Sequence, residues 1–304
     1  MTLPHLAARI FNTPLLMAEA KAAAILIGVG GRLLPGDVEI VGVAADKVVQ
    51  HLPRSQLGVV GDPLGSWWAE NTDAPMSDVV RGVAIIRVEG TLAHKGSYIG
   101  ARSGITSYEG LQAQISEARR SPAIRAAVIE VDSFGGEVAG AFETAEALFA
   151  LSAEKPTLAI LTDFALSAGY LLASAARRIV IGPTGMAGSI GVILAHVDIS
   201  QQLAADGVRV TLISAGKHKA DGAPTQPLAD PVRERLQERA EAVRTLFAKT
   251  VGKFRGDRFP AEVALKTEAM EYQGADAVAA GLVDGMAYAA PAFEAFVTAV
   301  GRRR

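Results

Sequence analysis

An apolar, β-branched run that ends in two glycines constrains the fold of this chain more than any other segment. The run is Val128-Ile129-Glu130-Val131, and Gly135-Gly136 follows it just ahead of an alanine-rich helical pattern. This order is typical of a strand, a tight turn and a helix. Backbone N–H groups of such a turn need not take part in the hydrogen bonds between strands, so they are able to bind an oxyanion.

The strand-then-helix pattern recurs along the chain and predicts an α/β body. Strands are expected at 83–88, 126–131, 157–161, 178–181 and 208–213, and helices after Gly136 and from Ser167. Thr106-Ser107-Tyr108-Glu109 reads as a capping box that opens a helix through Arg120. A long helix begins at Asp230-Pro231, and its apolar stripe fits either packing on its own subunit or a subunit interface. The stripe consists of Val232, Leu236, Val243, Phe247, Val251 and Phe254.

Clusters of glycine and proline divide the chain into four parts. We expect an N-terminal extension at 1–55, a linker at 56–80, the α/β body at 81–290 and a tail at 291–304. The linker carries Trp67-Trp68, which either packs on the body or forms a docking site. The apolar runs at 22–31 and 158–176 do not predict a membrane helix: the first is too short, and Asp163 and Gly169 interrupt the second.

Composition excludes several classes of function. The 304 residues include 30 basic and 32 acidic side chains, so a net charge of −2 offers nucleic acid no long-range attraction. The chain has no cysteine, which excludes disulfides, thiolate metal sites and a cysteine nucleophile, and suits a reducing cytosol. His5, His51 and His94 are scattered, and no His/Asp/Glu cluster has metal-ligand spacing. We therefore expect no metal.

Ser167 is the candidate nucleophile because it stands among small apolar residues in Phe164-Ala165-Leu166-Ser167-Ala168-Gly169-Tyr170. A serine in this position can also serve simply as the N-cap of the following helix. A hydroxyl becomes a nucleophile when a neighbouring base takes its proton. A lysine is such a base when burial lowers its pKa from about 10.4 toward about 7 to 8.

Two lysines, Lys217 and Lys219, follow in Ser214-Ala215-Gly216-Lys217-His218-Lys219. In an extended segment both side chains would point the same way, so local sequence does not choose between them. Either can equally be an exposed lysine in a polar loop. His196 and Asp198 offer a different relay to Ser167, although alternation puts them on one face of a strand, where they do not line up readily.

These elements together resemble the signal peptide peptidase A (SppA) family of serine–lysine peptidases, whose fold is shared with Clp protease and the crotonases. Gly135-Gly136, Ser167-Ala168-Gly169, Gly188-Ser189-Ile190-Gly191-Val192 and Lys219 stand in the family's order between about Val83 and Asp284. Phe134 replaces the proline that most relatives carry before the double glycine. The segments 3–15 and 216–224 resemble one branch, the lambdoid-phage head maturation proteases of the protein C type.

The resemblance implies a Clp/crotonase-like fold of repeated β-β-α units and a mechanism without cofactor. It selects Lys219 as the base of Ser167, Gly136 and Ala168 as N–H donors to the oxyanion, and Gly135 and Ser189 as substrate-binding residues. It implies an oligomeric endopeptidase in the bacterial host cytoplasm or the procapsid, acting on scaffold, portal or capsid proteins or on itself. A cytosolic housekeeping peptidase and a catalytically silent assembly factor remain alternatives, and a crotonase would not need the serine–lysine pair.

Overall fold

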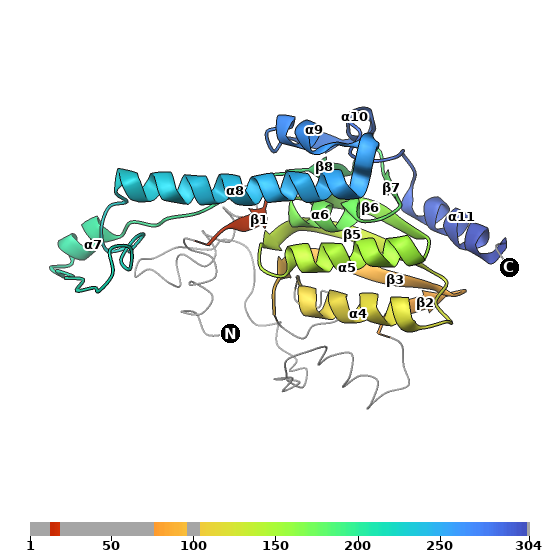
Figure 1. The fold of residues 1–304 in the computed structure, drawn as a ribbon, viewed down its shortest axis with the longest axis horizontal. Helices are drawn as coiled ribbons and strands as arrows, with labels where there is room; N and C mark the ends of the chain where they lie inside the picture. The colour runs from red at the N-terminus through yellow and green to blue at the C-terminus, as the bar shows by residue number, and fades with distance from the viewer. Residues whose placement is uncertain (1–12, 19–75, 96–103, 303–304) are drawn as a thin grey trace.

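The computed structural model describes residues 13–18, 76–95 and 104–302 (Figure 1). The predicted extension and linker, with Trp67-Trp68, lie almost wholly outside these residues. No helix in the described ranges is long and apolar enough to cross a membrane.

A sheet built on parallel strands forms the centre of the molecule (Figure 1). Strands β3 (Val83–Ala93), β5 (Ala126–Glu137) and β6 (Thr157–Leu166) pair in parallel in that order. β7 (Arg178–Ile181) and β8 (Met186–Gly188) both pair in parallel with β6, and β4 (Ile105–Ser107) pairs with β3. Three further strands run antiparallel to their neighbours: β1 (Leu15–Met17) on β5, β2 (Asp78–Val80) on β3 and β9 (Glu271–Gln273) on β8.

The long strands break midway and so form two-strand units. Pairing of β3 with β5 shifts register between Glu89 and Thr91, and pairing of β5 with β6 shifts between Val131 and Ser133. The first half of β6 pairs with β7 and its last three residues pair with β8. Each unit then leads into a helix: α4 (Tyr108–Arg120), α5 (Ala141–Glu154) or α6 (Ala168–Ser174). This repeated β-β-α pattern confirms the expected fold class.

Alternation along the strands gives the sheet two apolar faces. Ala84, Ile129 and Ala159 belong to the larger cluster, which also contains the buried side chains of α4, α5 and α6. Their neighbours Val83, Val128 and Leu158 join a smaller cluster covered by Val297 and Val300 of α11 (Ala289–Arg302). Burial on both faces explains why these strands read as continuous apolar runs.

The predicted strands at 83–88, 126–131, 157–161 and 178–181 are all present, the first three continuing further than expected. The helix at 108–120 is confirmed, since Ser107 Oγ accepts the Gly110 N–H at 3.1 Å and so caps it. The helix expected after Gly136 begins later, at Ala141, because β5 continues through the glycines to Glu137. The run 158–176 lies in β6 and α6 as expected of core.

The predicted strand at 208–213 is wrong. These residues have no strand structure and follow the short helix α7 (Ser200–Ala205) in an exposed arm that runs to residue 229. Val208, Val210, Leu212 and Ile213 are exposed, Ile213 to 96%. A β-branched run becomes a strand only when it pairs with another, and no strand of the described chain lies beside it.

The long helix α8 (Asp230–Arg255) confirms the helix predicted from Asp230 and connects the arm to the body (Figure 1). Its last turns pack on the core through Phe247, Val251 and Phe254, whereas Val232 and Leu236 are only half-buried. Beyond it the chain forms a 3-10 turn (Gly256–Arg258), α9 (Ala261–Lys266), β9 and α10 (Gly274–Ala279). The apolar stripe is thus partly core and partly on the projecting half of the helix.

Candidate active site

Ser167 lies at the sharp turn between β6 and α6, with φ 53° and ψ −119°. A left-handed φ at a residue other than glycine costs about 1 to 3 kcal/mol, so the surrounding structure must impose it. The Ser167 N–H donates to the Gly188 carbonyl at 2.9 Å, and the Ser167 carbonyl accepts the Leu171 N–H at 2.9 Å. These bonds hold the serine between the sheet and the helix.

The Ser167 hydroxyl does not cap the helix. Ser167 occupies the N-cap position of α6 but makes no side-chain capping bond. Its Oγ is buried and has no hydrogen-bond partner within the described chain. A buried hydroxyl without a partner loses about 1 to 3 kcal/mol of hydrogen bonding, and such groups gather where function requires them. The structure therefore argues against a purely capping role.

Small residues after Ser167 let α6 approach β5 closely. A side chain at Gly169 would come within 2.9 Å of the Ser133 carbonyl oxygen, so the helix needs glycine there. The Ala168 amide nitrogen lies beside Gly135, 3.0 Å from where a Cβ of that residue would stand. The structure thus brings the predicted donor Ala168 next to the predicted double glycine.

The N–H of the first glycine of the pair is engaged by a side chain of its own strand. The Gly135 N–H donates to Ser133 Oγ at 3.1 Å, and that hydroxyl donates to the Gly90 carbonyl at 2.6 Å. Gly135 has φ 95°, and a Cβ at Gly136 would come within 1.9 Å of the Leu92 carbonyl oxygen. Both positions therefore require glycine, and the Gly135 N–H already has an acceptor.

Phe134, which precedes the double glycine, is held by packing. Its ring stacks on Phe164 with centroids 4.2 Å apart and an interplanar angle of 28°. Because Phe164 belongs to β6, this stack joins the strand before the double glycine to the strand before Ser167. An aromatic pair of this kind stabilises by about 0.5 to 1.5 kcal/mol beyond its buried area. The turn keeps its rigidity without the proline.

The Gly188–Val192 segment contacts Ser167 through the Gly188 carbonyl, which accepts the Ser167 N–H. Gly188 has φ 121° and Ser189 φ 55°, and Ser189 is buried. The Ser189 N–H donates to the Met270 carbonyl at 3.1 Å, which fixes the turn on the C-terminal part of the chain. Ser189 therefore directly follows Gly188, whose carbonyl accepts the Ser167 N–H.

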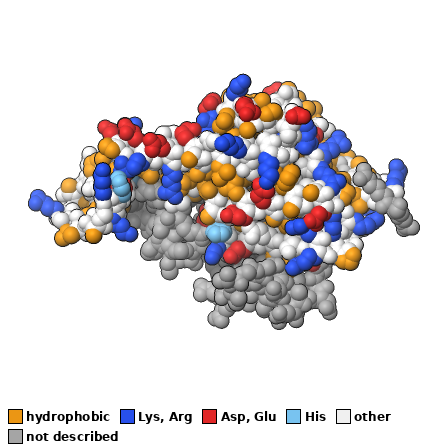
Figure 2. All heavy atoms as spheres, viewed as in Figure 1, with side chains coloured by type: hydrophobic (Ala, Val, Ile, Leu, Met, Phe, Trp, Pro, Cys, Tyr) orange, Lys and Arg blue, Asp and Glu red, His pale blue; other side chains and the backbone are white. Residues whose placement is uncertain are grey.

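Lys219 does not meet Ser167 in this structure. It lies on the exposed arm, as does Lys217, at the end of α8 that projects from the body (Figure 1). Nearby, Asp221 accepts hydrogen bonds from Arg235 and from His218 Nδ1, the latter at 3.0 Å, and the Arg235 bond chiefly holds the pKa of Asp221 below its usual range. Figure 2 shows basic and hydrophobic side chains gathered on this outer part of the molecule.

His196 and Asp198 do not form a relay with Ser167. Asp198 is exposed, and its carboxylate accepts the Ser200 N–H at 2.9 Å just before α7. Hydrogen bonding by Ser200 lowers the pKa of Asp198, as does the nearby His196. His196 lies in a groove between residues 192–196 and α8. In the part of the chain that the structure describes, no group of three or more His, Asp or Glu could hold a metal ion.

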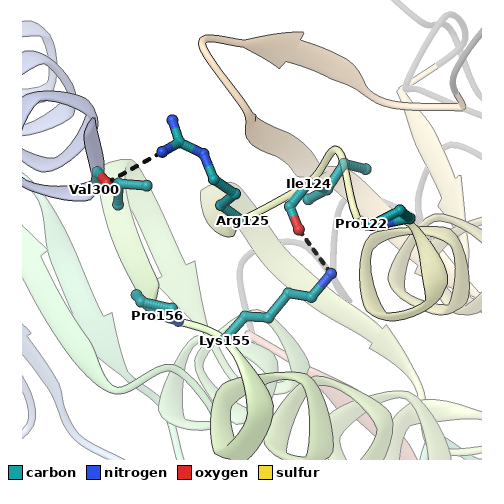
Figure 3. Close-up of a pocket in the computed structure, with 6 residues that line it drawn as sticks. All are labelled: Pro122, Ile124, Arg125, Lys155, Pro156 and Val300. Carbon is teal, nitrogen blue, oxygen red and sulfur yellow. Dashed lines mark hydrogen bonds between the residues drawn. The ribbon is translucent and has the colours of Figure 1, made fainter. Parts of the chain in front are cut away.

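Lys155, which is partly buried, has a structural role (Figure 3). It lines a pocket with Pro122, Ile124, Arg125, Pro156 and Val300. Its Nζ donates to the carbonyl oxygens of Ala118, Ser121 and Ile124, at 2.5, 2.9 and 2.7 Å, near the C-terminal end of α4. Burial lowers the pKa of Lys155, but its three donors already have acceptors. This pocket is not the site of Ser167.

Sequence reasoning missed β1. Leu15–Met17 runs antiparallel to Gly135–Glu137, and Leu15 and Ile193 exchange hydrogen bonds of 2.9 and 3.0 Å on the opposite side. Three apolar residues in a row are too short a signal to predict a strand. The segment lies against the predicted oxyanion glycines.

A parallel sheet with a buried serine on a strained strand–helix turn is the arrangement found in serine hydrolases of the α/β class. The chain belongs to peptidase family S49, whose model matches residues 150–301. Capsid assembly protease C of Escherichia phage lambda is 35% identical over 302 residues, 99% of this chain and 67% of that protein. Head-tail preconnector protein GP5 of Enterobacteria phage P21 is 33% identical over 299 residues, 98% of this chain and 58% of that protein.

More distant matches cover less of the chain or are less similar. Protease 4 of Salmonella typhi is 32% identical over 174 residues, 57% of this chain and 28% of that protein. A mutant of the membrane-bound stomatin-specific protease 1510-N aligns with 71% of this chain and 83% of its own, at 14% identity and TM-score 0.43. A ClpP1 mutant from Listeria monocytogenes aligns with 67% and 91%, at 13% identity and TM-score 0.41.

Proposed function

We propose that the chain is an endopeptidase in which Ser167 is the nucleophile, Lys219 is the base, and the Gly136 and Ala168 N–H groups stabilise the oxyanion. The observation that carries the proposal is the buried Ser167 Oγ, which lacks a partner in the described chain and stands on a strained turn beside the Ala168 amide. A pair of N–H donors aimed at a developing oxyanion is worth several kcal/mol of barrier.

The reaction proceeds through an acyl-enzyme. Neutral Lys219 accepts the Ser167 proton as Oγ bonds to the peptide carbonyl carbon. The C–N bond then breaks, and protonated Lys219 returns the proton to the leaving amine. Water then attacks the ester carbonyl while Lys219 takes a proton from it. The bond between the carbonyl carbon and Ser167 Oγ breaks, Lys219 gives the proton to Oγ, and the new carboxyl end leaves. No cofactor takes part.

Lys219 must move to Ser167 or come from another copy of the chain. The arm that carries it exposes Val208, Leu212 and Ile213, and an apolar, basic projection of this kind favours contact with a protein surface. We therefore propose that the working enzyme is an oligomer in which the arm lies against a body.

Mixing variants tests this arrangement. Ser167→Ala and Lys219→Ala are each expected to be inactive on an unfolded protein such as casein. If the arm serves a second copy, mixing the two inactive proteins restores part of the activity, because some sites then receive an intact serine and an intact lysine. If the arm folds back on its own body, the mixture stays inactive. Activity of either single variant comparable to wild type would refute the dyad.

We further propose that the natural role is capsid assembly in a phage or prophage, with cleavage of scaffold, portal or the protease itself during prohead maturation in the host cytoplasm. The two phage relatives, whose names refer to capsid assembly and to a head-tail preconnector, support this role. Mass spectrometry of the termini of co-expressed scaffold and portal proteins tests it. New termini that appear with wild type and not with Ser167→Ala are expected, and intact partners would favour a housekeeping peptidase.

A further inference from the structure

The segment Leu15–Ala18 occupies a groove between two parts of the site. On one side β1 pairs antiparallel with β5, with Leu15 opposite Glu137, Leu16 opposite Gly136 and Met17 opposite Gly135. The Ala18 N–H extends this ladder by donating to the Phe134 carbonyl at 2.9 Å. On the other side Leu15 exchanges two hydrogen bonds with Ile193, which follows the Gly188–Val192 turn. The segment is thus a middle strand with partners on both edges.

The register directs the Leu16 carbonyl to the predicted oxyanion site. Hydrogen-bonded pairs alternate in an antiparallel ladder, so the Ala18–Phe134 bond makes Leu16 and Gly136 the next such pair. The Leu16 oxygen lies 2.1 Å and the Ala168 nitrogen 3.0 Å from where a Cβ of Gly135 would stand. Because Gly135 has no side chain, the Leu16 carbonyl lies close to both proposed donors, the N–H groups of Gly136 and Ala168.

Burial of the segment is almost complete. Leu15 and Met17 are 5% exposed, Ala18 is 2% exposed, and Leu16 is fully buried in the larger core cluster. With both backbone edges paired and the side chains buried, another extended polypeptide cannot add to β5 at Gly136 while the segment is in place. An extended substrate that uses backbone hydrogen bonds needs this same edge.

We infer that Leu15–Ala18 is an intramolecular pseudosubstrate: it fills the substrate groove in the register of a bound polypeptide and must leave before another protein is cut. This inference rests on the proposed peptidase activity. Because Lys219 is distant from Ser167 in this state, the segment can occupy the site without being cleaved. The groove accordingly takes an extended apolar strand, with a residue like Leu16 placing its carbonyl at the donors.

A disulfide that locks the segment in place tests the inference. Leu15 and Ile193 form a hydrogen-bonded antiparallel pair, for which Cα atoms stand about 5.5 Å apart, within the usual range for a disulfide. The chain has no cysteine, so oxidation of a Leu15→Cys/Ile193→Cys double variant affects only the introduced pair. The full-length protein is assayed on casein after mild oxidation and again after reduction. Asp78→Cys/Ile85→Cys, which joins β2 to β3, is the matched control.

The locked protein is expected to cleave casein at least about tenfold more slowly than the same protein after reduction. Substrate binds only to those molecules whose groove the segment has left. The control pair and the two single variants should not respond to oxidation in this way. A cut at the Leu16–Met17 bond under reducing conditions would also support the register.

Two results would overturn the inference. One is failure of the Leu15–Ile193 disulfide to form while the control disulfide forms. The other is equal cleavage by the locked and the reduced protein. If the reduced protein, wild type and control all fail to cleave casein, the proposed peptidase function fails instead. The synthetic hexapeptide of residues 13–18 gives a second measurement: it should inhibit the reduced double variant competitively, and a scrambled hexapeptide should not.

Discussion

The Ser167 N–H donates to the carbonyl oxygen of Gly188 at 2.9 Å, so the proposed nucleophile takes its position from a glycine turn outside its own strand. Gly188 in turn lies close to the chain near Met270, since a Cβ at Gly188 would stand 2.6 Å from the Met270 carbonyl oxygen. The left-handed φ of 53° at Ser167 is thus imposed by contacts that β6 and α6 alone do not provide.

Gly188→Ala should therefore damage both stability and activity. The added methyl meets backbone at 2.6 Å, and φ 121° is a conformation that alanine rarely adopts. We expect a loss of about 2 kcal/mol in the free energy of unfolding and a large fall in kcat/KM. The control is Gly285→Ala, where the methyl meets no atom within 4 Å. Urea unfolding that finds the two variants equally stable would contradict this account.

Ser167→Gly should separate stability from activity. Glycine tolerates positive φ, so the variant loses the strain of about 1 to 3 kcal/mol but gains chain entropy in the unfolded state worth about 0.5 to 1 kcal/mol. Both Ser167→Gly and Ser167→Ala remove the buried, unpartnered hydroxyl and should be inactive and more stable than wild type. Ser167→Ala keeps the strain, so we expect its free energy of unfolding to be about 1 kcal/mol lower than that of Ser167→Gly. Thermal and urea unfolding of the three proteins provide the measurement.

Substitution of three candidate bases should distinguish the proposed mechanisms. Lys219→Ala is expected to abolish casein cleavage, because nucleophile and base act as one unit. Lys217→Ala and His196→Ala are expected to retain most of it. The pattern in which His196→Ala is inactive and Lys219→Ala active would instead identify the histidine as the base. Circular dichroism of each variant shows whether a lost activity reflects a lost fold.

Sequence predicted the parts of the fold that depend on local pattern. The strand at 126–131 and the helix from 108 to 120 follow from burial of both strand faces and from local capping, and both are present, with Ser107 as the N-cap. The expected strand at 208–213 is absent, because pairing depends on distant residues and this stretch has no partner among those described. Strand β1 was missed because its three residues are too few to indicate a strand. It forms because distant residues, at 135–137 and 193, pair with it.

For the candidate site, too, the sequence shows the local motifs but not the relations between distant residues. The serine turn and the double glycine are local motifs, and the fold brings Ala168 beside Gly135. The relation of Ser167 to Lys219 depends on where an exposed arm lies, which neither motif encodes. The hydrogen bond from the Gly135 N–H to the Ser133 hydroxyl depends on the local backbone path and was not predicted from the sequence.

The ion pair between Asp284 and the buried Arg255 makes stability depend on pH. Asp284 accepts hydrogen bonds from Arg255 at 2.8 and 3.0 Å, from Arg258 at 3.0 Å and from the Ile179 N–H at 2.7 Å. Burial alone would raise the pKa of Asp284, but the bonds and charge of Arg255, with the other donors, outweigh burial and hold that pKa below its usual range. The carboxylate is thus more stable in the folded state than in the unfolded one.

Asp284→Asn should cost about 3 kcal/mol in the free energy of unfolding at pH 7, because Arg255, whose side chain is 1% exposed, would keep a buried charge without its partner. A lowered folded-state pKa stabilises above the unfolded value of about 3.9 and loses its effect as pH falls through the folded value. The difference between wild type and Asp284→Asn should therefore stay constant from pH 7 to 5 and shrink below about pH 4. Urea unfolding at pH 7, 5, 4 and 3 measures it, with Arg258→Ala as the milder control, since that side chain is 45% exposed. A difference that persists undiminished at pH 3 would show that Asp284 does not titrate with a lowered pKa.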